Sequence, residues 1–157
     1  MRAAFPFKIA ILDDCLVSTK LQERLISTRF PGAEITVCHE PRLLPGQDVY
    51  LLDNQFGTEE HALELARRIR AVEPESLIIV WSATITKDLL KRLSTVGINA
   101  VAEKGNQGDI EAALGVMASF FRRPRRSHTF GETIRSIRDL LSEWNSHLDS
   151  EEKQATA

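Results

Sequence analysis

The sequence predicts an α/β protein in which five parallel strands form one doubly wound sheet with helices on both faces. Two observations support this fold class. Short apolar runs alternate with segments of helical periodicity over residues 7–121, as in a series of βαβ units. The first run, KIAIL, is continuous instead of alternating with polar residues, which is typical of a strand that is covered on both faces.

Five runs are predicted to be strands because they are short, apolar and often β-branched. They span residues 8–12, 34–38, 49–53, 77–81 and 99–103. The run LIIVW at 77–81 is the richest in β-branched residues and is predicted to lie at the centre of the sheet. With right-handed crossovers, the flavodoxin-like strand order 2-1-3-4-5 is a common arrangement of five such strands.

Apolar residues at helical spacing predict helices over 16–30, 62–72, 88–96 and 110–121. The first of these is predicted to bury Leu16, Leu21, Leu25, Ile26 and Phe30, and the second Ala62, Leu63, Leu65, Ala66, Ile69 and Val72. Pro31-Gly32, Pro74 and Gly97 mark the helix ends. Only HEPRLLPGQD, residues 39–48, separates the second and third strands, which is too short for a usual helical crossover. The second helix of the fold is therefore expected to be short or absent.

Four of the predicted strands run into reactive polar residues. Asp13 and Asp14 follow the first strand, Asp53 ends the third, Ser82 follows the fourth, and Lys104 follows the fifth through Glu103. The carboxyl ends of parallel strands meet at one edge of a sheet, and open α/β sheets bind ligands there. We therefore expect three carboxylates, a hydroxyl and an ammonium group to lie close together.

These groups suit a divalent cation and a phosphoryl group. Bare carboxylates at short range repel each other, and Mg²⁺, which prefers oxygen ligands and often pairs with phosphate, removes that conflict. Asp14, with help from Asp13, is predicted to bind the metal. Asp53 is the predicted nucleophile, because a carboxylate can attack phosphorus and become an aspartyl phosphate. Lys104 and the Ser82 hydroxyl would then contact the phosphoryl oxygens.

At these residues the sequence resembles the receiver domain of two-component response regulators, over residues 7–121. Asp13-Asp14 is similar to the acid pair, YLLD to the phosphoacceptor strand, VWSA to the switch strand and AVAEK to the strand before the lysine. The resemblance implies that Asp53 accepts a phosphoryl group from a histidine kinase or phosphotransfer protein in a Mg²⁺-dependent reaction. It also implies that the carbonyl of Gln55 completes the metal shell, and that output is a changed contact with a downstream protein.

Several positions depart from the receiver pattern. Val101 stands where an aromatic switch residue is usual, and Gly57 and Gly105 stand where prolines are usual. These departures favour an alternative hypothesis, in which the chain is a constitutive scaffold or dimerisation module that acts independently of phosphorylation. A Mg²⁺-dependent phosphohydrolase is disfavoured, because Gln55 occupies the place of a second acid and no capping domain is evident. The chain is thus expected to be a signalling protein with at most self-catalysed phosphoryl transfer and dephosphorylation.

Composition limits the partners. A formal net charge of −2 and a pI near 6.1 do not indicate general affinity for nucleic acid. No apolar run approaches the roughly 20 residues of a membrane span, and the N-terminus does not read as a signal peptide. Two cysteines make no disulfide framework. These features favour a cytoplasmic location.

The last part of the sequence is predicted to be an extension of the receiver domain, which spans 1–121. A basic linker at 122–128 contains RRPRR, an amphipathic helix follows at 129–149, and a disordered tail occupies 150–157. The helix carries an apolar stripe at coiled-coil spacing, which includes Ile134, Ile137, Leu141, Trp144 and Leu148. This stripe is expected to pair with its own copy in a homodimer or with the receiver surface. The extension is too short for a DNA-binding output domain.

Overall fold

The computed structural model describes residues 6–123. The chain divides into two units after Arg123, so the described residues belong to the first. Its strands are β1 Lys8–Leu12, β2 Glu34–Cys38, β3 Val49–Leu52, β4 Gln55–Phe56, β5 Glu59–Glu60, β6 Leu77–Ser82 and β7 Ala100–Glu103. Its helices are α1 Leu16–Arg29, α2 Ala62–Val72, α3 Lys87–Ser94 and α4 Gln107–Phe121.

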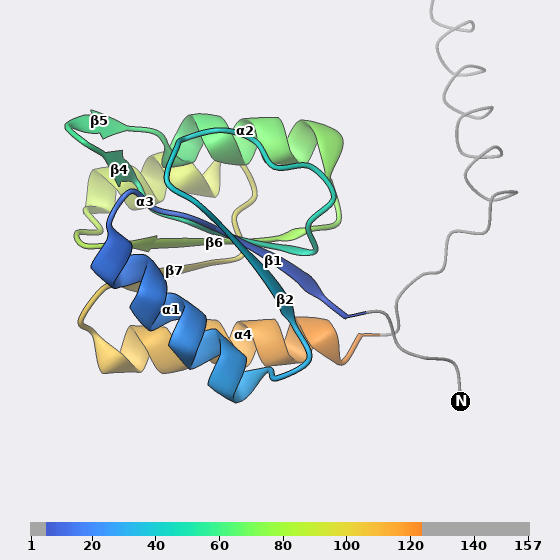
Figure 1. The fold of residues 1–157 in the computed structure, drawn as a ribbon. Helices are drawn as coiled ribbons and strands as arrows, with labels where there is room; N and C mark the ends of the chain where they lie inside the picture. Colours follow the sequence, from blue (N-terminus) through green and yellow to red (C-terminus); the bar gives the residue numbers. More distant parts are fainter. Residues whose placement is uncertain (1–5, 124–157) are drawn as a thin grey trace, which may run out of the picture. The chain divides into compact units, whose positions relative to one another are not determined.

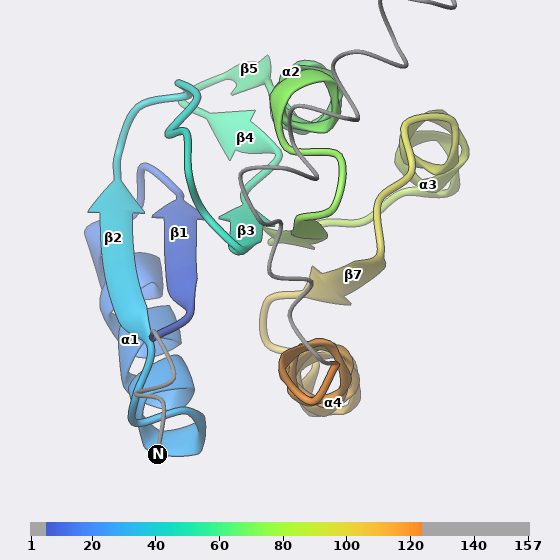
Figure 2. The same cartoon turned by 90° about the vertical axis from the view of Figure 1, so that its right-hand side faces the viewer.

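Five of the strands form one parallel sheet in the order β2-β1-β3-β6-β7. Helices α1 and α4 cover one face of this sheet, and α2 and α3 cover the other (Figures 1 and 2). Numbered along the sheet's own strands, the order is 2-1-3-4-5. The prediction of a flavodoxin-like doubly wound sheet is therefore confirmed.

The core lies in two layers because side chains of the central strands alternate between the two faces. Ile9, Ile11, Leu51, Ile79 and Trp81 pack toward α1 and α4. The alternate residues of the same strands pack toward α2 and α3: Ala10, Leu12, Tyr50, Leu52, Ile78 and Val80. Every residue of β3 and β6 is buried, as expected for strands that are covered on both sides.

The connection between β2 and β3 contains no helix, as predicted. Leu43 and Leu44 of this connection are partly buried and pack against the core on the α2 side. The hydroxyl of the fully buried Tyr50 donates a hydrogen bond to the carbonyl of Leu44 over 2.6 Å. Burial raises the pKa of Tyr50 to about 12. This bond ties the loop to the sheet.

Two helices begin earlier than their apolar residues suggest. The side chain of Thr86 accepts a hydrogen bond from the Leu89 N–H at the start of α3, and Asn106 accepts one from the Asp109 N–H at the start of α4. Such caps satisfy backbone donors that have no partner within the helix. Polar first turns therefore belong to both helices, although the apolar pattern begins after them.

The predicted buried face of α1 is partly wrong. Leu16 and Leu21 are more than half exposed, whereas Thr19, Gln22 and Ile26 are buried. The face that meets the sheet therefore begins with polar residues and becomes apolar only in the second half of the helix. The reason is that the start of α1 lies against the buried carboxylate of Asp13, to which Ser18 and Gln22 donate hydrogen bonds. In α2, Val72 is also exposed and not buried as predicted.

Predictions for the extension lie outside the described residues. These are most of the basic linker at 122–128, the amphipathic helix at 129–149, the tail at 150–157, and a homodimer formed through Ile134, Ile137, Leu141, Trp144 and Leu148. They stay predictions. Among the described residues, no helix combines the length and the apolar character needed to cross a membrane.

Candidate functional site

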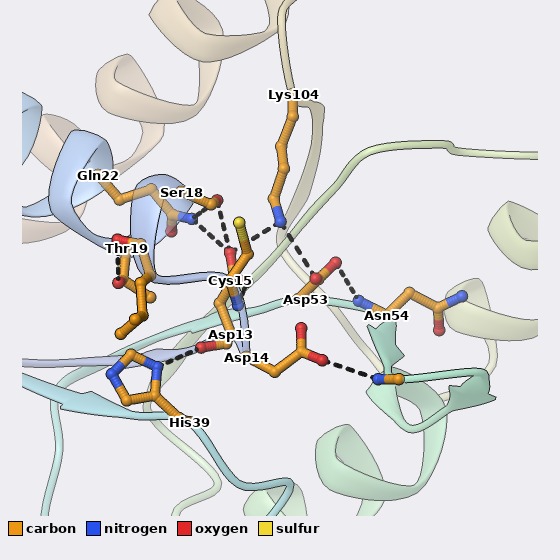
Figure 3. Close-up of polar contacts among 12 residues, drawn as sticks. Asp13, Asp14, Cys15, Ser18, Thr19, Gln22, His39, Asp53, Asn54 and Lys104 are labelled. Carbon is orange, nitrogen blue, oxygen red and sulfur yellow. Dashed lines mark hydrogen bonds and ion pairs between the residues drawn. The ribbon is translucent and has the colours of Figure 1, made fainter.

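The sheet hydrogen bonds continue just past β1 and β3 and thereby fix two aspartates. The Asp13 N–H donates to the carbonyl of Cys38 over 3.1 Å, and the Asp53 N–H donates to the carbonyl of Leu12 over 2.8 Å. Both residues therefore sit at the carboxyl edge of the sheet in positions set by neighbouring strands. Figure 3 shows their side chains pointing toward each other and toward Lys104.

The predicted acidic residues converge. One carboxylate oxygen from each of Asp13, Asp14 and Asp53 lies within 4.8 Å of the others. Asp13 is 1% exposed and Asp53 is 6% exposed, whereas Asp14 is open to solvent. The cluster is thus reached from outside through Asp14, with the other two carboxylates behind it.

Lys104, which follows the edge strand β7, forms ion pairs with two of the acids. Its Nζ lies 2.7 Å from Asp13 Oδ2 and 3.1 Å from Asp53 Oδ2. Its backbone N–H donates to the carbonyl of Ser82 over 2.8 Å, one step beyond the paired residues of β6 and β7. The backbone of β6 therefore places the lysine, and its long side chain reaches back to the centre of the cluster.

The charges of this cluster stabilise each other. Burial raises the pKa of Asp13, but hydrogen bonds from Lys104, Ser18 and the Cys15 N–H outweigh this effect and hold it below its usual range. Burial likewise lowers the pKa of Lys104, and the hydrogen bond and charge of Asp13 and Asp53 raise it above its usual range. Asp13 and Lys104 thus carry opposite charges at neutral pH.

Three contacts of Asp13 were not predicted from the sequence. Its Oδ2 accepts hydrogen bonds from Ser18 Oγ over 2.6 Å and from Gln22 Nε2 over 2.9 Å. The ring of His39 donates through Nδ1 to the Asp13 carbonyl over 2.9 Å. The available signal was that Ser18 and Gln22 share one side of a helix that begins directly after the acid pair. A search for apolar residues at helical spacing misses two polar residues that share a helix face.

The short hairpin formed by β4 and β5 supports Asp14. The Gly57 N–H at the hairpin turn donates to Asp14 Oδ2 over 2.7 Å. Gly57 has a φ of +62°, which a glycine adopts without the strain that other residues would incur. Gln55 lies at the start of the same hairpin, two residues beyond Asp53. Gly57 therefore has a local structural role, since its backbone conformation presents the N–H to Asp14.

Ser82 lies at the same edge as the acidic cluster, as predicted. It is the last residue of β6 and is buried. Its register partner is Glu103, the residue before Lys104. Asn54 is also buried, and its Oδ1 has no hydrogen-bond partner among residues 6–123, but Figure 3 shows its side chain directed away from the three carboxylates. Asn54 is therefore not a candidate ligand of this cluster.

The donor set suits Mg²⁺ or Ca²⁺, since both prefer carboxylate oxygens. Within the described part of the chain, Asp14 accepts one hydrogen bond and Asp53 accepts two, from Lys104 and from the Asn54 N–H. Both carboxylates therefore keep acceptor positions for a cation. Their combined negative charge exceeds what Lys104 alone offsets, so the cluster favours a further positive charge.

Solved structures provide the comparison, since no protein-family model and no curated protein matches the sequence. The BeF3-activated receiver domain of DrrB, a response regulator of Thermotoga maritima, aligns with a TM-score of 0.64 over 75% of this chain and 99% of that domain, at 17% identity. The CheX-CheY-BeF3-Mg complex from Borrelia burgdorferi gives 0.62, with 76% and 92% coverage and 19% identity.

The chain has the fold of a response-regulator receiver domain. A response regulator of Burkholderia pseudomallei, solved with a phosphorylated aspartic acid, a calcium ion and citrate, has the same fold, with a TM-score of 0.58 at 20% identity over 72% of each chain. The resemblance stated from the sequence is confirmed at the level of the receiver fold.

Proposed function

We propose that this receiver-fold protein is a phosphorylation-dependent signalling switch that accepts a phosphoryl group on Asp53. The observation that carries the proposal is the convergence of three carboxylates within 4.8 Å, with the Lys104 ammonium between Asp13 and Asp53. A nucleophile, a cation site and a fixed positive charge are the parts that phosphoryl transfer to a carboxylate needs. Solved receiver domains that share this fold include phosphorylated and BeF3-bound forms.

In the proposed reaction an Asp53 carboxylate oxygen attacks the phosphorus of a phosphodonor. A new P–O bond forms, the bond from phosphorus to the donor's leaving atom breaks, and the leaving group departs with the electron pair of that bond. Lys104 would hold one phosphoryl oxygen as a point charge, and Ser82 would donate a hydrogen bond to another. Mg²⁺ held by Asp14, Asp53 and the carbonyl of Gln55, with Asp13 beside it, would neutralise phosphoryl charge when bound.

The expected partners follow from this chemistry. A histidine kinase or phosphotransfer protein would supply the phosphoryl group, and a downstream protein would read the changed surface. One solved neighbour with this fold is a CheX-CheY complex, which supports a partner protein as the reader of that surface.

Mass spectrometry of the intact protein tests the proposal. The full chain is incubated with Mg²⁺ and acetyl phosphate, and we expect one added phosphoryl group that requires the metal. Asp53→Asn should show no adduct, while Cys15→Ser, which keeps all the proposed groups, should react like the native chain. The proposal is contradicted if the native chain stays unmodified or if Asp53→Asn is modified equally.

One observation favours the second candidate, a constitutive scaffold. Val101 packs against a cluster that contains Val80, Leu89 and Leu93. A β-branched side chain is restricted in its χ1 angle, so Val101 cannot swing between a buried and an exposed rotamer as an aromatic switch residue would. A scaffold would keep its oligomeric state and partner affinity when beryllofluoride and Mg²⁺ mimic the phosphorylated form. Light scattering with and without this mimic separates the two candidates, since a switch should respond.

A further inference from the structure

Strand β2 forms one edge of the parallel sheet, and among the described residues its only strand partner is β1 (Figure 2). The Glu34 N–H donates to the carbonyl of the residue before β1, and the Cys38 carbonyl accepts from the N–H of the residue after β1. Successive residues of a strand point their backbone groups to opposite sides, so Glu34, Thr36 and Cys38 face β1. The backbone N–H and C=O groups of Ile35 and Val37 therefore point away from the sheet.

These outward groups form an open strand edge. Among residues 6–123, the outward N–H and C=O groups of Ile35 and Val37 have no hydrogen-bond partner. Edge strands of natural proteins usually carry a lysine, a proline, a bulge or a covering segment that prevents pairing with another chain. Residues 35–37 are Ile-Thr-Val, all β-branched and well suited to a strand, and the Thr36 side chain is exposed. The middle of β2 can therefore accept another strand.

The opposite edge of the sheet, strand β7, is closed in part by the chain itself. The Lys104 N–H donates to the carbonyl of Ser82 in β6, so the N–H of the preceding residue, Glu103, points outward. Asp109 in the first turn of α4 accepts a hydrogen bond from this N–H through Oδ2 over 3.1 Å. A strand that pairs with β7 would have to displace this contact. The β2 edge of a second copy is therefore a better partner for β2 than a β7 edge.

Two copies of β2 complement each other in an antiparallel arrangement centred on Thr36. Ile35 of one chain then lies opposite Val37 of the other, and the two residues exchange both of their backbone hydrogen bonds. The two-fold symmetry repeats this pair, so the outward groups of Ile35 and Val37 are satisfied in both chains. The half-buried side chains of these two residues meet on the α1 side of the sheet, and the exposed Thr36 side chains meet on the other side.

The charges that flank residues 35–37 do not oppose this pairing. Glu34 lies beside Lys8, its register partner in β1, and Glu40 forms an ion pair with Arg42 over 3.5 Å. Each acid has a basic residue beside it in its own chain, which reduces the repulsion between the acids of two copies.

We propose that β2 is an interface at which two copies of this chain pair edge to edge and join their five-stranded sheets into one continuous sheet. A two-fold contact uses the same surface of both copies and closes at the dimer, so it does not lead to fibres. This inference goes beyond the proposed function and does not depend on it, because the pairing needs neither Mg²⁺ nor a phosphoryl group.

Amide hydrogen exchange of the full chain, resolved by residue with NMR, tests the backbone pairing. The Ile35 and Val37 N–H groups should exchange quickly in dilute protein and at least about tenfold more slowly in concentrated protein, where the dimer forms. The Thr36 N–H faces β1 and provides an internal control, since it should be protected at both concentrations. Fast exchange of the Ile35 and Val37 N–H groups at every concentration would overturn the inference.

Charge substitutions at Thr36 test the symmetry of the pairing. Thr36→Lys alters an exposed side chain and should leave the folded monomer intact, but it places two ammonium groups opposite each other in the dimer. We expect dimerisation to weaken at least about tenfold in analytical ultracentrifugation. Thr36→Glu should have the same effect, and an equal mixture of the two variants should restore a dimer that contains one chain of each. Thr95→Lys makes the same change at an exposed residue after α3 and should dimerise like the native chain.

Three results would overturn the inference: a native chain that stays monomeric, a Thr36→Lys chain that dimerises as tightly as the native chain, or a mixture of the two charge variants that stays monomeric. A dimer that forms instead through the predicted helix at 129–149 would be insensitive to both Thr36 substitutions and would also overturn it. The phosphoryl adduct on Asp53 is measured separately, so the switch and the β2 interface can fail independently.

Discussion

Replacing Lys104 by methionine would leave the carboxylates of Asp13 and Asp53 without the ammonium group that lies between them. The side chains of these acids are 1% and 8% exposed, and that of Lys104 is 20% exposed. Removing one partner of a buried ion pair costs about 3–5 kcal/mol. Because Lys104 is partly open to solvent, we expect the lower end of this range, about 3 kcal/mol of unfolding free energy.

The pH dependence provides a second, independent measure of this loss. The folded-state pKa of Asp13 is depressed, so its stabilisation is present above its unfolded value of 3.8 and is lost as the pH falls through the folded value. The pKa of Lys104 is raised, so its stabilisation is present below 10.5 and is lost as the pH rises through the folded value. The cost of Lys104→Met should therefore be largest between these limits and shrink outside them.

Urea unfolding followed by circular dichroism measures this cost in metal-free buffer across the pH range. Lys104→Arg keeps the positive charge and should lose much less stability than Lys104→Met. The reasoning is refuted if Lys104→Met costs less than about 1 kcal/mol near neutral pH, the level typical of an exposed ion pair. A cost that stays constant from acid to neutral pH would contradict it as well.

Two further predictions concern the fold. Leu16→Ser should change the unfolding free energy by less than about 0.5 kcal/mol, because the side chain is 61% exposed. Ile26→Ala on the same helix should cost about 2–5 kcal/mol, because it opens a cavity in the core. Similar urea midpoints for the two variants would contradict the assignment of Ile26 to the buried face of α1 and Leu16 to the exposed face. Tyr50→Phe should cost about 1 kcal/mol by leaving the Leu44 carbonyl without its donor. The folded-state pKa of Tyr50 is raised to about 12, so its stabilisation is complete below 10.0 and is lost as the pH rises toward 12; the native chain should lose more stability over this interval than Tyr50→Phe, and equal losses would exclude the hydroxyl as the cause.

Local patterns determined most of the fold from the sequence. The continuous apolar run at 77–81 predicted a strand that is covered on both faces, and every residue of β6 is buried. Its place in the sheet differs from the prediction, because β3 is the central strand and β6 lies between β3 and the edge strand β7. The short segment between β2 and β3 excluded a helical crossover by its length. The convergence of Asp13, Asp14, Asp53 and Lys104 also followed from sequence, because parallel strands bring their carboxyl ends to one edge.

Tertiary structure decided what the side chains at that edge contact. The periodicity of α1 pointed to Leu16 and Leu21 as buried residues, yet Thr19 and Gln22 occupy the inner face. The reason is that the first turns of α1 lie beside buried carboxylates, where hydrogen-bond donors are more favourable than apolar groups. Helical spacing identifies residues that share a face, but the charge that the face meets comes from strands far away in the sequence. Which donors contact the Asp13 carboxylate is therefore a property of the folded site.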